Sequence, residues 1–283
     1  MHVGVISFNT EYGIRVEDLA RAVEERGFES LWASEHSHIP AGSNMPYAGS
    51  GDLPKATFHV ADPFVCLAVA AAVTTKIKLG TSVCLVTEHD PITLAKTVAT
   101  LDHLSNGRFL FGVGGGWNRE EVANHGVPFK SRWKIVRERV AAMKEIWTQD
   151  VASYHGEFVN FDRIISYPKP VQKPYPPVIM GSANEFARKR AAKYCDGWLP
   201  VDMRFEDLAA AVEDLHDKLR EEGRDPEGYP VTVLCADGDT TPDTIRQYRD
   251  MGMERAVIMA GDQDRDTVLS RLDEFVDVAA EVA

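Results

Sequence analysis

Short apolar runs alternate along the chain with longer segments in which apolar residues recur every three or four positions. Residues 2–8 form the first run, and residues 16–28 follow it with Val16, Leu19 and Val23 on one helical face. Runs of the first kind predict buried strands, and segments of the second kind predict amphipathic helices. The chain therefore begins with a strand that is followed by a helix.

The same alternation continues to the end of the chain. We expect further strands at residues 30–34, 77–86, 108–114, 176–182, 196–201, 229–236 and 255–260. We expect further helices at residues 62–73, 90–104, 131–148, 184–194, 205–223, 241–252 and 266–282. This α/β rhythm predicts one domain over residues 1–283, a single (β/α)8 TIM barrel. A doubly wound open sheet is the alternative fold.

Two segments interrupt this rhythm. Residues 35–61 form a long stretch rich in Gly, Pro and Ser after the second predicted strand. Residues 149–175 contain prolines and aromatic residues without a helical period, and we expect an insertion between strands four and five, folded as a hairpin plus extended chain. Because loops carry much of the specificity of a barrel, we expect both segments to select the substrate.

Composition narrows the range of partners and compartments. The net charge of -12 disfavours nucleic acid as a partner, because an acidic surface repels phosphate backbones. The longest apolar run, residues 64–73, is about half a membrane span, and the first residues lack the pattern of a signal peptide. Four scattered cysteines without a Cys-x-x-Cys motif are typical of reduced thiols. We expect a cytoplasmic protein whose partner is a small-molecule substrate.

The stretch "RFLFGVGGGWNREE", residues 108–121, places four glycines directly after a predicted strand. A dinucleotide fingerprint that starts at Gly112 needs a third glycine at position 117, which is Trp117. The dinucleotide interpretation therefore fails. Two interpretations stay open: small residues that permit a tight strand-to-helix turn, or a strand end without side chains on which a flat ring can lie.

Three other strand ends carry polar residues. Glu35, His36 and His38 follow the second strand, and a histidine there can exchange a proton near neutral pH, although it can equally be a solvated loop residue. Ser82 is either a site hydroxyl or a barrel-core serine. Ser182 has capping-box spacing to the glutamate three residues later, so the following helix can bind an anion or simply be capped.

Long blocks of the sequence resemble the luciferase-like family of (β/α)8 flavin and deazaflavin enzymes. The resemblance rests on "GFESLWASEHSHIP", on "KLGTSVCLVTEHDPITLAKTVATLDHLSNGRFLFGVGGGWNREEV", and on "GEFVNFD" followed by "YPKPVQKPYPPVIMGSANEFARKRAAKYCDGWLP". The middle block is the most specific. The part of the chain after residue 200 matches the family only in its strand-helix rhythm.

The resemblance implies roles for particular residues. Catalysis would fall to His36, oriented by Glu35, as in family members that use the deazaflavin coenzyme F420. The segment "LGTSV" resembles the one that bears a cis peptide bond against the ring, here between Ser82 and Val83. The remaining cofactor-binding residues implied by the resemblance are Gly114 and Gly115 beneath the ring, Asn118 at its polar edge, and a phosphate turn of Gly181, Ser182, Ala183 and Asn184.

One departure limits the resemblance. A glutamate that acts as catalytic acid in the sugar-phosphate dehydrogenases of the family falls on Gly115 here, so that activity is not implied. The chain also lacks the longer insertion of the light-emitting members. The family further implies a homodimer.

Four functional hypotheses follow. The leading one is hydride transfer between F420 and a small organic substrate. The alternative within the family is an FMN-dependent monooxygenase that uses reduced flavin. A metal-dependent hydrolase based on His36 and His38 is a remote alternative, although we expect no metal site. A cofactor carrier without catalysis is the last, because Gly115 replaces an acid.

Overall fold

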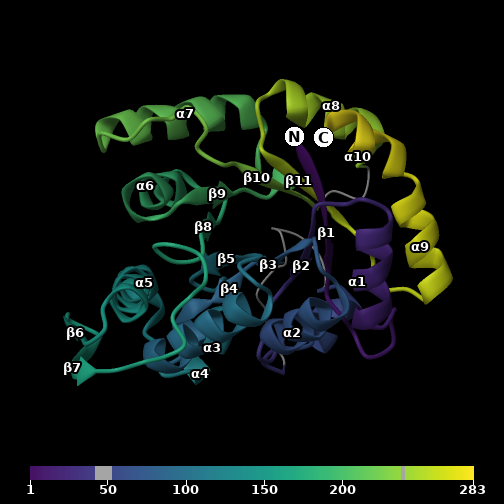
Figure 1. The fold of residues 1–283 in the computed structure, drawn as a ribbon. Coiled ribbons are helices and arrows are strands. Elements are labelled where there is room, and N and C mark those ends of the chain that lie inside the picture. The colour runs from purple at the N-terminus through teal and green to yellow at the C-terminus, as the bar shows by residue number, and fades with distance from the viewer. Residues whose placement is uncertain (42–52, 237–239) are drawn as a thin grey trace.

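The computed structural model describes residues 1–41, 53–236 and 240–283 of the chain. Eight parallel strands curve into a nearly closed barrel, and helices surround the sheet (Figure 1). The predicted (β/α)8 barrel is confirmed, and the open doubly wound sheet is not formed. Residues 42–52, which belong to the 35–61 segment of the sequence analysis, lie outside the described residues.

The barrel strands follow one another around the sheet with parallel pairing throughout. Isolated bridges from Trp198 to Val231 and from Val201 to Leu234 join the two edges of this sheet. In spatial order the strands are β10 (Thr232–Cys235), β11 (Arg255–Met259), β1 (His2–Ser7), β2 (Ser30–Ala33), β3 (Lys78–Thr81), β5 (Phe109–Gly114), β8 (Val178–Gly181) and β9 (Gly197–Leu199).

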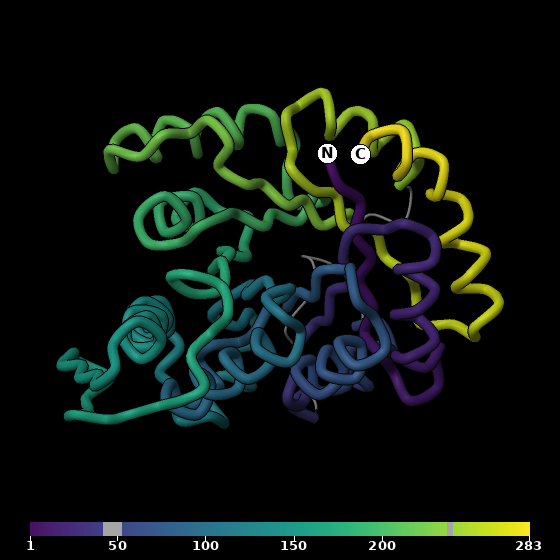
Figure 2. Tube along the Cα trace, viewed as in Figure 1, coloured from purple at the N-terminus to yellow at the C-terminus, as the bar shows by residue number. Residues whose placement is uncertain are grey.

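Helices cover the outside of the sheet, and the two chain ends lie side by side (Figure 2). The amino group of Met1 donates a hydrogen bond to the carbonyl of Val282 at 2.7 Å. None of the described helices has a stretch long and apolar enough to cross a bilayer. The helices are α1 (Val16–Glu25), α2 (Pro63–Val73), α3 (Pro91–Leu104), α4 (Arg119–Asn124), α5 (Arg132–Thr148), α6 (Glu185–Tyr194), α7 (Leu208–Glu221), α8 (Pro242–Asp250), α9 (Arg265–Asp273) and α10 (Val276–Val282).

Two predicted elements are each divided in the structure. The strand expected at residues 77–86 is β3 followed by β4 (Cys84–Leu85), and the peptide bond between Ser82 and Val83 is cis. The helix expected at residues 266–282 is α9 followed by α10. The chain turns between these helices, where the side chain of Phe275 is fully buried.

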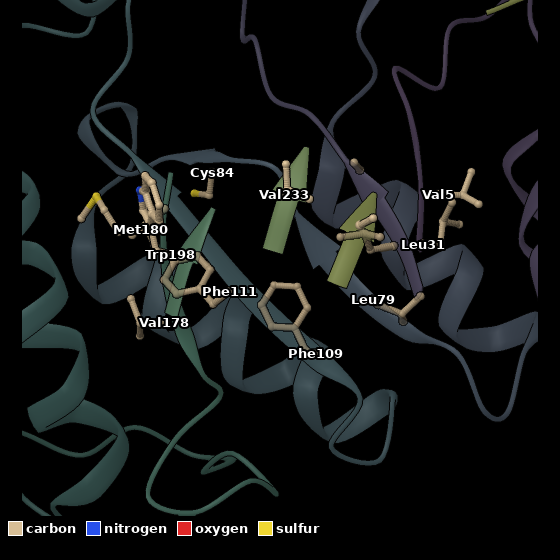
Figure 3. Packing of buried hydrophobic residues seen from close by; sticks show 14 of the residues in the cluster. Val5, Leu31, Leu79, Cys84, Phe109, Phe111, Val178, Met180, Trp198 and Val233 are labelled. Atoms are coloured by element: carbon tan, nitrogen blue, oxygen red, sulfur yellow. The ribbon is translucent and has the colours of Figure 1, made fainter. Parts of the chain in front are cut away.

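Outward-facing strand residues form the larger core, between the sheet and the helices. Val5, Leu31, Leu79, Phe111 and Val233 come from five different strands, and each is at most 1% exposed. Figure 3 labels these five side chains among others of the same cluster. Because every second residue of a strand points to the same face, each strand contributes regularly to this core.

Inward-facing residues form a second, smaller core inside the barrel. The indole of Trp32 is fully buried there and donates a hydrogen bond to Ser30 Oγ at 2.8 Å. A Cβ atom on Gly80 would lie 2.2 Å from this indole, and one on Gly4 would lie 3.0 Å from its Nε1. These two strand glycines therefore leave the space that the indole fills.

The predicted insertion forms a hairpin of β6 (Ala152–His155) and β7 (Asn160–Ile164), which lies outside α5 (Figure 2). The buried Glu138 carboxylate accepts hydrogen bonds from three successive amides of the hairpin turn, of which that from Phe158 is 2.7 Å long. The extended chain after the hairpin reaches the amino-terminal end of β5, where Gln172 Nε2 donates to the carbonyl of Phe109 at 2.7 Å. The expected hairpin plus extended chain is therefore present.

A buried ion pair lies at the amino-terminal end of the barrel. The Arg255 side chain is 2% exposed, and its Nε lies 2.6 Å from Glu29 Oε2. Burial alone would raise the pKa of Glu29, but the Arg255 guanidinium overrides this effect and lowers the pKa to about 2. The pair joins the start of β11 to the residue that precedes β2.

We expect Glu29→Gln to reduce the free energy of unfolding by about 3–5 kcal/mol at neutral pH, because the Arg255 charge loses its buried partner. The pKa of Glu29 is lower in the folded chain, so its stabilisation is present above about pH 4.5 and is lost as the pH falls toward 2. Denaturant unfolding of both chains at several pH values measures this.

The matched control is Glu254→Gln. Glu254 contacts the same guanidinium at 3.2 Å but is 39% exposed, so its loss should cost less than about 1 kcal/mol. Equal losses for the two variants, or a difference between wild type and Glu29→Gln that does not shrink in acid, would contradict the assignment.

Candidate active site

A cavity of about 570 Å³ opens at the carboxyl ends of β3, β5 and β8. The carboxyl-terminal face is where barrel enzymes bind their ligands. No residue of the 149–175 insertion lines this cavity. The expected role of the insertion in substrate selection stays a prediction. The cavity is lined by eight of the nine expected cofactor-binding residues, namely Ser82, Val83, Gly114, Gly115, Gly181, Ser182, Ala183 and Asn184.

The side chain of Val83 is seated between two strand ends that carry no side chain. A Cβ atom on Gly114 would lie 2.6 Å from Val83 Cγ2, and one on Gly181 would lie 2.5 Å from Val83 Cγ1. Two residues before Gly114 on the same strand, a Cβ atom on Gly112 would lie 1.9 Å from the carbonyl oxygen of Thr81. The glycines therefore permit close packing of the strand ends, and they leave a cavity floor without side chains. That a flat ring lies on this floor stays a prediction.

The wall beside this floor comes from the start of α5. A Cβ atom on Gly115 would lie 3.3 Å from the Trp133 ring, so the ring packs directly against the glycine backbone. Gly116 has a φ of +73°, a conformation that glycine adopts without strain. The chain then turns into α4 through Trp117, which also lines the cavity.

The turn after β8 leads into the amino terminus of α6. The sequence analysis expected Ser182 to cap this helix, but the N-cap is Asn184, whose side chain accepts a hydrogen bond from Ala187 N at 2.9 Å. Ser182 has a φ of 138°, and its carbonyl accepts a hydrogen bond from Trp198 Nε1. Ser182 is thus a turn residue, and the positive end of the α6 dipole faces the cavity through Ala183 and Asn184.

His36 is held by a carboxylate that the sequence analysis missed. Its Nδ1 lies 2.9 Å from Glu121 Oε2 and 3.0 Å from Oε1, and Glu121 is fully buried. Trp117 Nε1 donates to His36 Nε2 at 3.3 Å. A neutral imidazole with its proton on Nδ1 satisfies both contacts. The signal for Glu121 was the spacing Asn118-x-x-Glu121, which is typical of the start of a helix.

Glu35 does not orient His36, so that expectation is wrong. Its carboxylate accepts a hydrogen bond from Leu85 N and lies 2.7 Å from His89 Nε2. Adjacent residues of extended chain point in opposite directions, which separates the carboxylate of Glu35 from the imidazole of His36. Burial alone would lower the pKa of His89, but the Glu35 carboxylate overrides this effect and raises it.

Asn118 serves the helix that carries Glu121. It is fully buried, and its Oδ1 accepts hydrogen bonds from Glu120 N at 3.0 Å and Glu121 N at 3.2 Å. Within the described chain its Nδ2 has no hydrogen-bond partner. Asn118 is the one expected cofactor-binding residue that does not line the cavity.

Glu88 and His125 lie near Glu121, the carboxylate that contacts His36. Burial, followed by the charge of Glu121, raises the pKa of Glu88 to about 8, so Glu88 carries a proton at neutral pH. Its Oε2 lies 3.3 Å from His125 Nε2.

The metal hypothesis needs His36 and His38 to converge, and they contact different groups. His38 Nδ1 lies 2.9 Å from Ser37 Oγ, and its Nε2 accepts a hydrogen bond from Asn124. Possible ligand atoms of Glu35, Cys84 and His89 do lie within 4.8 Å of one another. However, the side chains of Glu35 and His89 already contact each other. Burial also raises the pKa of the Cys84 thiol well above its usual value.

The sequence was compared with protein families and with individual proteins. The family model described as luciferase-like monooxygenase matches residues 9–250. The uncharacterized protein Rv0953c of Mycobacterium tuberculosis is 40% identical over 270 residues, which is 94% of each chain. An FMNH(2)-dependent dimethylsulfone monooxygenase of Pseudomonas putida is 33% identical over 136 residues, covering 47% of this chain and 38% of that protein.

Solved structures agree with the fold. Monooxygenase RslO1 from Streptomyces bottropensis superposes with a TM-score of 0.80 and 19% identity, covering 99% of each chain. An F420-dependent secondary alcohol dehydrogenase in complex with an F420-acetone adduct superposes with a TM-score of 0.77 and 18% identity, covering 100% of this chain and 99% of that one. At these identities the likeness shows a shared fold.

We expect Gly114→Ala to destabilise the chain by about 1–3 kcal/mol, because the new methyl group would overlap Val83. Replacing Val83 by Ala in the same chain should remove the overlap and recover part of the loss. A double-mutant cycle of unfolding free energies tests this, and additive effects of the two substitutions would contradict the packing described above.

Proposed function

Because the chain belongs to the luciferase-like monooxygenase family, we propose that it is an oxidoreductase that transfers a hydride between F420 and a small organic substrate. The observation that carries the proposal is the placement of the half-buried His36, which is held by the fully buried Glu121 and contacts Trp117, a residue that lines the cavity with the glycine floor. The dehydrogenase structure that shares the fold uses the same coenzyme, which supports the assignment.

The cavity fits a flat ring with an acidic tail. Its volume of about 570 Å³ lies in the range of roughly 300–1,000 Å³ that is typical of ligand sites. Gly114 and Gly115 would present backbone to the ring, and the side chain of Val83 lines the cavity beside them. At the other end, the turn from Gly181 to Asn184 and the α6 amino terminus would hold a phosphate group.

When bound, the deazaflavin supplies a carbon that accepts or donates hydride. Within the protein, Glu121 fixes the orientation of the imidazole and keeps the His36 proton on Nδ1. His36 Nε2 is then free of a proton and can accept one from a substrate hydroxyl, with Trp117 as its present donor. Ionised Glu121 stabilises the imidazolium that forms. The reverse reaction uses the same groups in the opposite order.

We expect His36→Ala to lower turnover by about 10²–10⁴-fold while cofactor affinity changes by less than about twofold. Glu121→Gln should also lower turnover and shift the pH profile of kcat/KM, because the imidazolium loses its counter-charge. Glu120→Gln, an exposed neighbour on the same helix, is the matched control and should behave as wild type. Unchanged turnover in His36→Ala would favour a cofactor carrier without catalysis.

Parallel fluorescence titrations of the purified protein with F420 and FMN test the cofactor. We expect F420 to bind at micromolar concentration or tighter and FMN to bind much more weakly. The opposite preference would overturn the deazaflavin proposal and favour an FMN-dependent monooxygenase. The homodimer, the cytoplasmic location and the absence of a nucleic-acid partner stay predictions of the sequence analysis.

A further inference from the structure

Arg132, in the first turn of α5, lines the cavity without a carboxylate partner. Its Nη1 donates to the carbonyl of Phe129 at 2.9 Å. Its Nε is buried and has no hydrogen-bond partner among the described residues. No carboxylate of the described chain forms an ion pair with it within 4.0 Å, although the protein as a whole is strongly acidic.

Arg190, on α6, lies beside Arg132 and also lacks a carboxylate partner among the described residues, although it does not itself line the cavity. Its guanidinium carbon lies 4.2 Å from the centre of the Trp133 ring, and that of Arg132 lies 5.5 Å from the same ring. The Nη1 atom of Arg190 is also buried and lacks a hydrogen-bond partner in the described part of the chain. Two guanidinium groups therefore share one indole.

A third arginine lies close to this pair. The guanidinium carbons of Arg119 and Arg132 lie 4.8 and 3.7 Å from the centre of the Phe129 ring. Burial, followed by the charges of Arg190 and Arg119, lowers the pKa of Arg132. By contrast, Arg188, on the same helix as Arg190, is paired with Asp214. Burying guanidinium N–H groups without acceptors is costly, and an anion bound at the cluster would supply acceptors for them.

We propose that Arg132 and Arg190 form an anion-binding subsite for the acidic tail of the ring cofactor. The inference rests on the proposed function, because it takes the ring to lie on the glycine floor. Arg132 lines the same cavity as Ala183 and Asn184, and Arg190 lies in the second turn of the helix that those residues begin. The α6 amino terminus and Arg132 therefore share one cavity, and Arg190 is stacked on the same Trp133 ring as Arg132.

The chemistry of the two cofactors makes this subsite selective. FMN ends in one phosphate group, whereas the F420 tail continues through a phosphodiester to lactyl and glutamyl carboxylates. Arginine donates paired N–H groups to either oxyanion, and its planar group can stay stacked on an aromatic ring while it does so. The subsite therefore favours the longer, more acidic tail.

The test compares three ligands that share one ring system: 8-hydroxy-5-deazariboflavin without a phosphate, the coenzyme with phospholactate alone, and F420 with its glutamates. Fluorescence titrations use wild type, Arg132→Gln, Arg190→Gln and Arg132→Lys. We expect each Gln variant to bind full-length F420 at least about tenfold more weakly, while affinity for the bare ring changes less than about twofold. Arg132→Lys should lose less affinity for F420 than Arg132→Gln, because it keeps the positive charge.

Lys130→Gln is the matched control, because it removes the same charge from an exposed position two residues before Arg132. It should bind all three ligands as wild type does. Thermal unfolding of each variant separates loss of binding from loss of folding, since a folded variant retains its affinity for the bare ring.

The outcomes distinguish a failure of the arginine subsite from a failure of the proposed function. Weaker binding of the phospholactate form in the variants assigns the arginines to the phospholactyl part of the tail, and weaker binding of the glutamylated form alone assigns them to the glutamyl carboxylates. Equal changes for all three ligands, or none, overturn the subsite. If wild type binds FMN and none of the deazaflavins, the proposed function fails. The variants are then compared with FMN and riboflavin, and an unchanged ratio of the two affinities overturns the subsite as well.

Discussion

The position of the Val83 side chain depends on the absence of side chains at Gly114 and Gly181. It fills the space where Cβ atoms of Gly114 and Gly181 would stand, so three strand ends approach one another more closely than side chains normally allow. Protein interiors tolerate little overlap, so both glycines are needed for this packing. The cavity floor is its result, because the same glycines leave backbone exposed beside the valine.

The barrel could be predicted from the sequence because strand and helix periods alternate with little ambiguity. Its interruptions could not. The apolar run through Ser82 has no feature that divides it into β3 and β4, and the helical period of residues 266–282 continues through the turn at Phe275. Helix α4 has only six residues, which is too short for periodicity to reveal.

The cavity lining was predictable because glycines and small polar residues at strand ends stand out against apolar strands. The contacts among titratable groups were not. Glu35 is the sequence neighbour of His36, yet Glu121, 85 positions away, holds the imidazole. That pairing depends on how the turn after Gly116 sends the chain into α4, which is a property of tertiary structure. The unpaired arginines were missed for the same reason, since α5 and α6 meet only in the folded barrel.

Helix α5 links the cavity wall to the β6–β7 hairpin. Trp133 stands at its start, and Glu138, which holds the hairpin turn, follows within about 9 Å along the helix axis. A helix of this length behaves as a stiff rod, so a change in the hairpin that moves Glu138 also moves the wall that faces the cavity. In a diverging lineage, insertions on the outside of the molecule could thus retune what the cavity admits while every barrel strand stays the same.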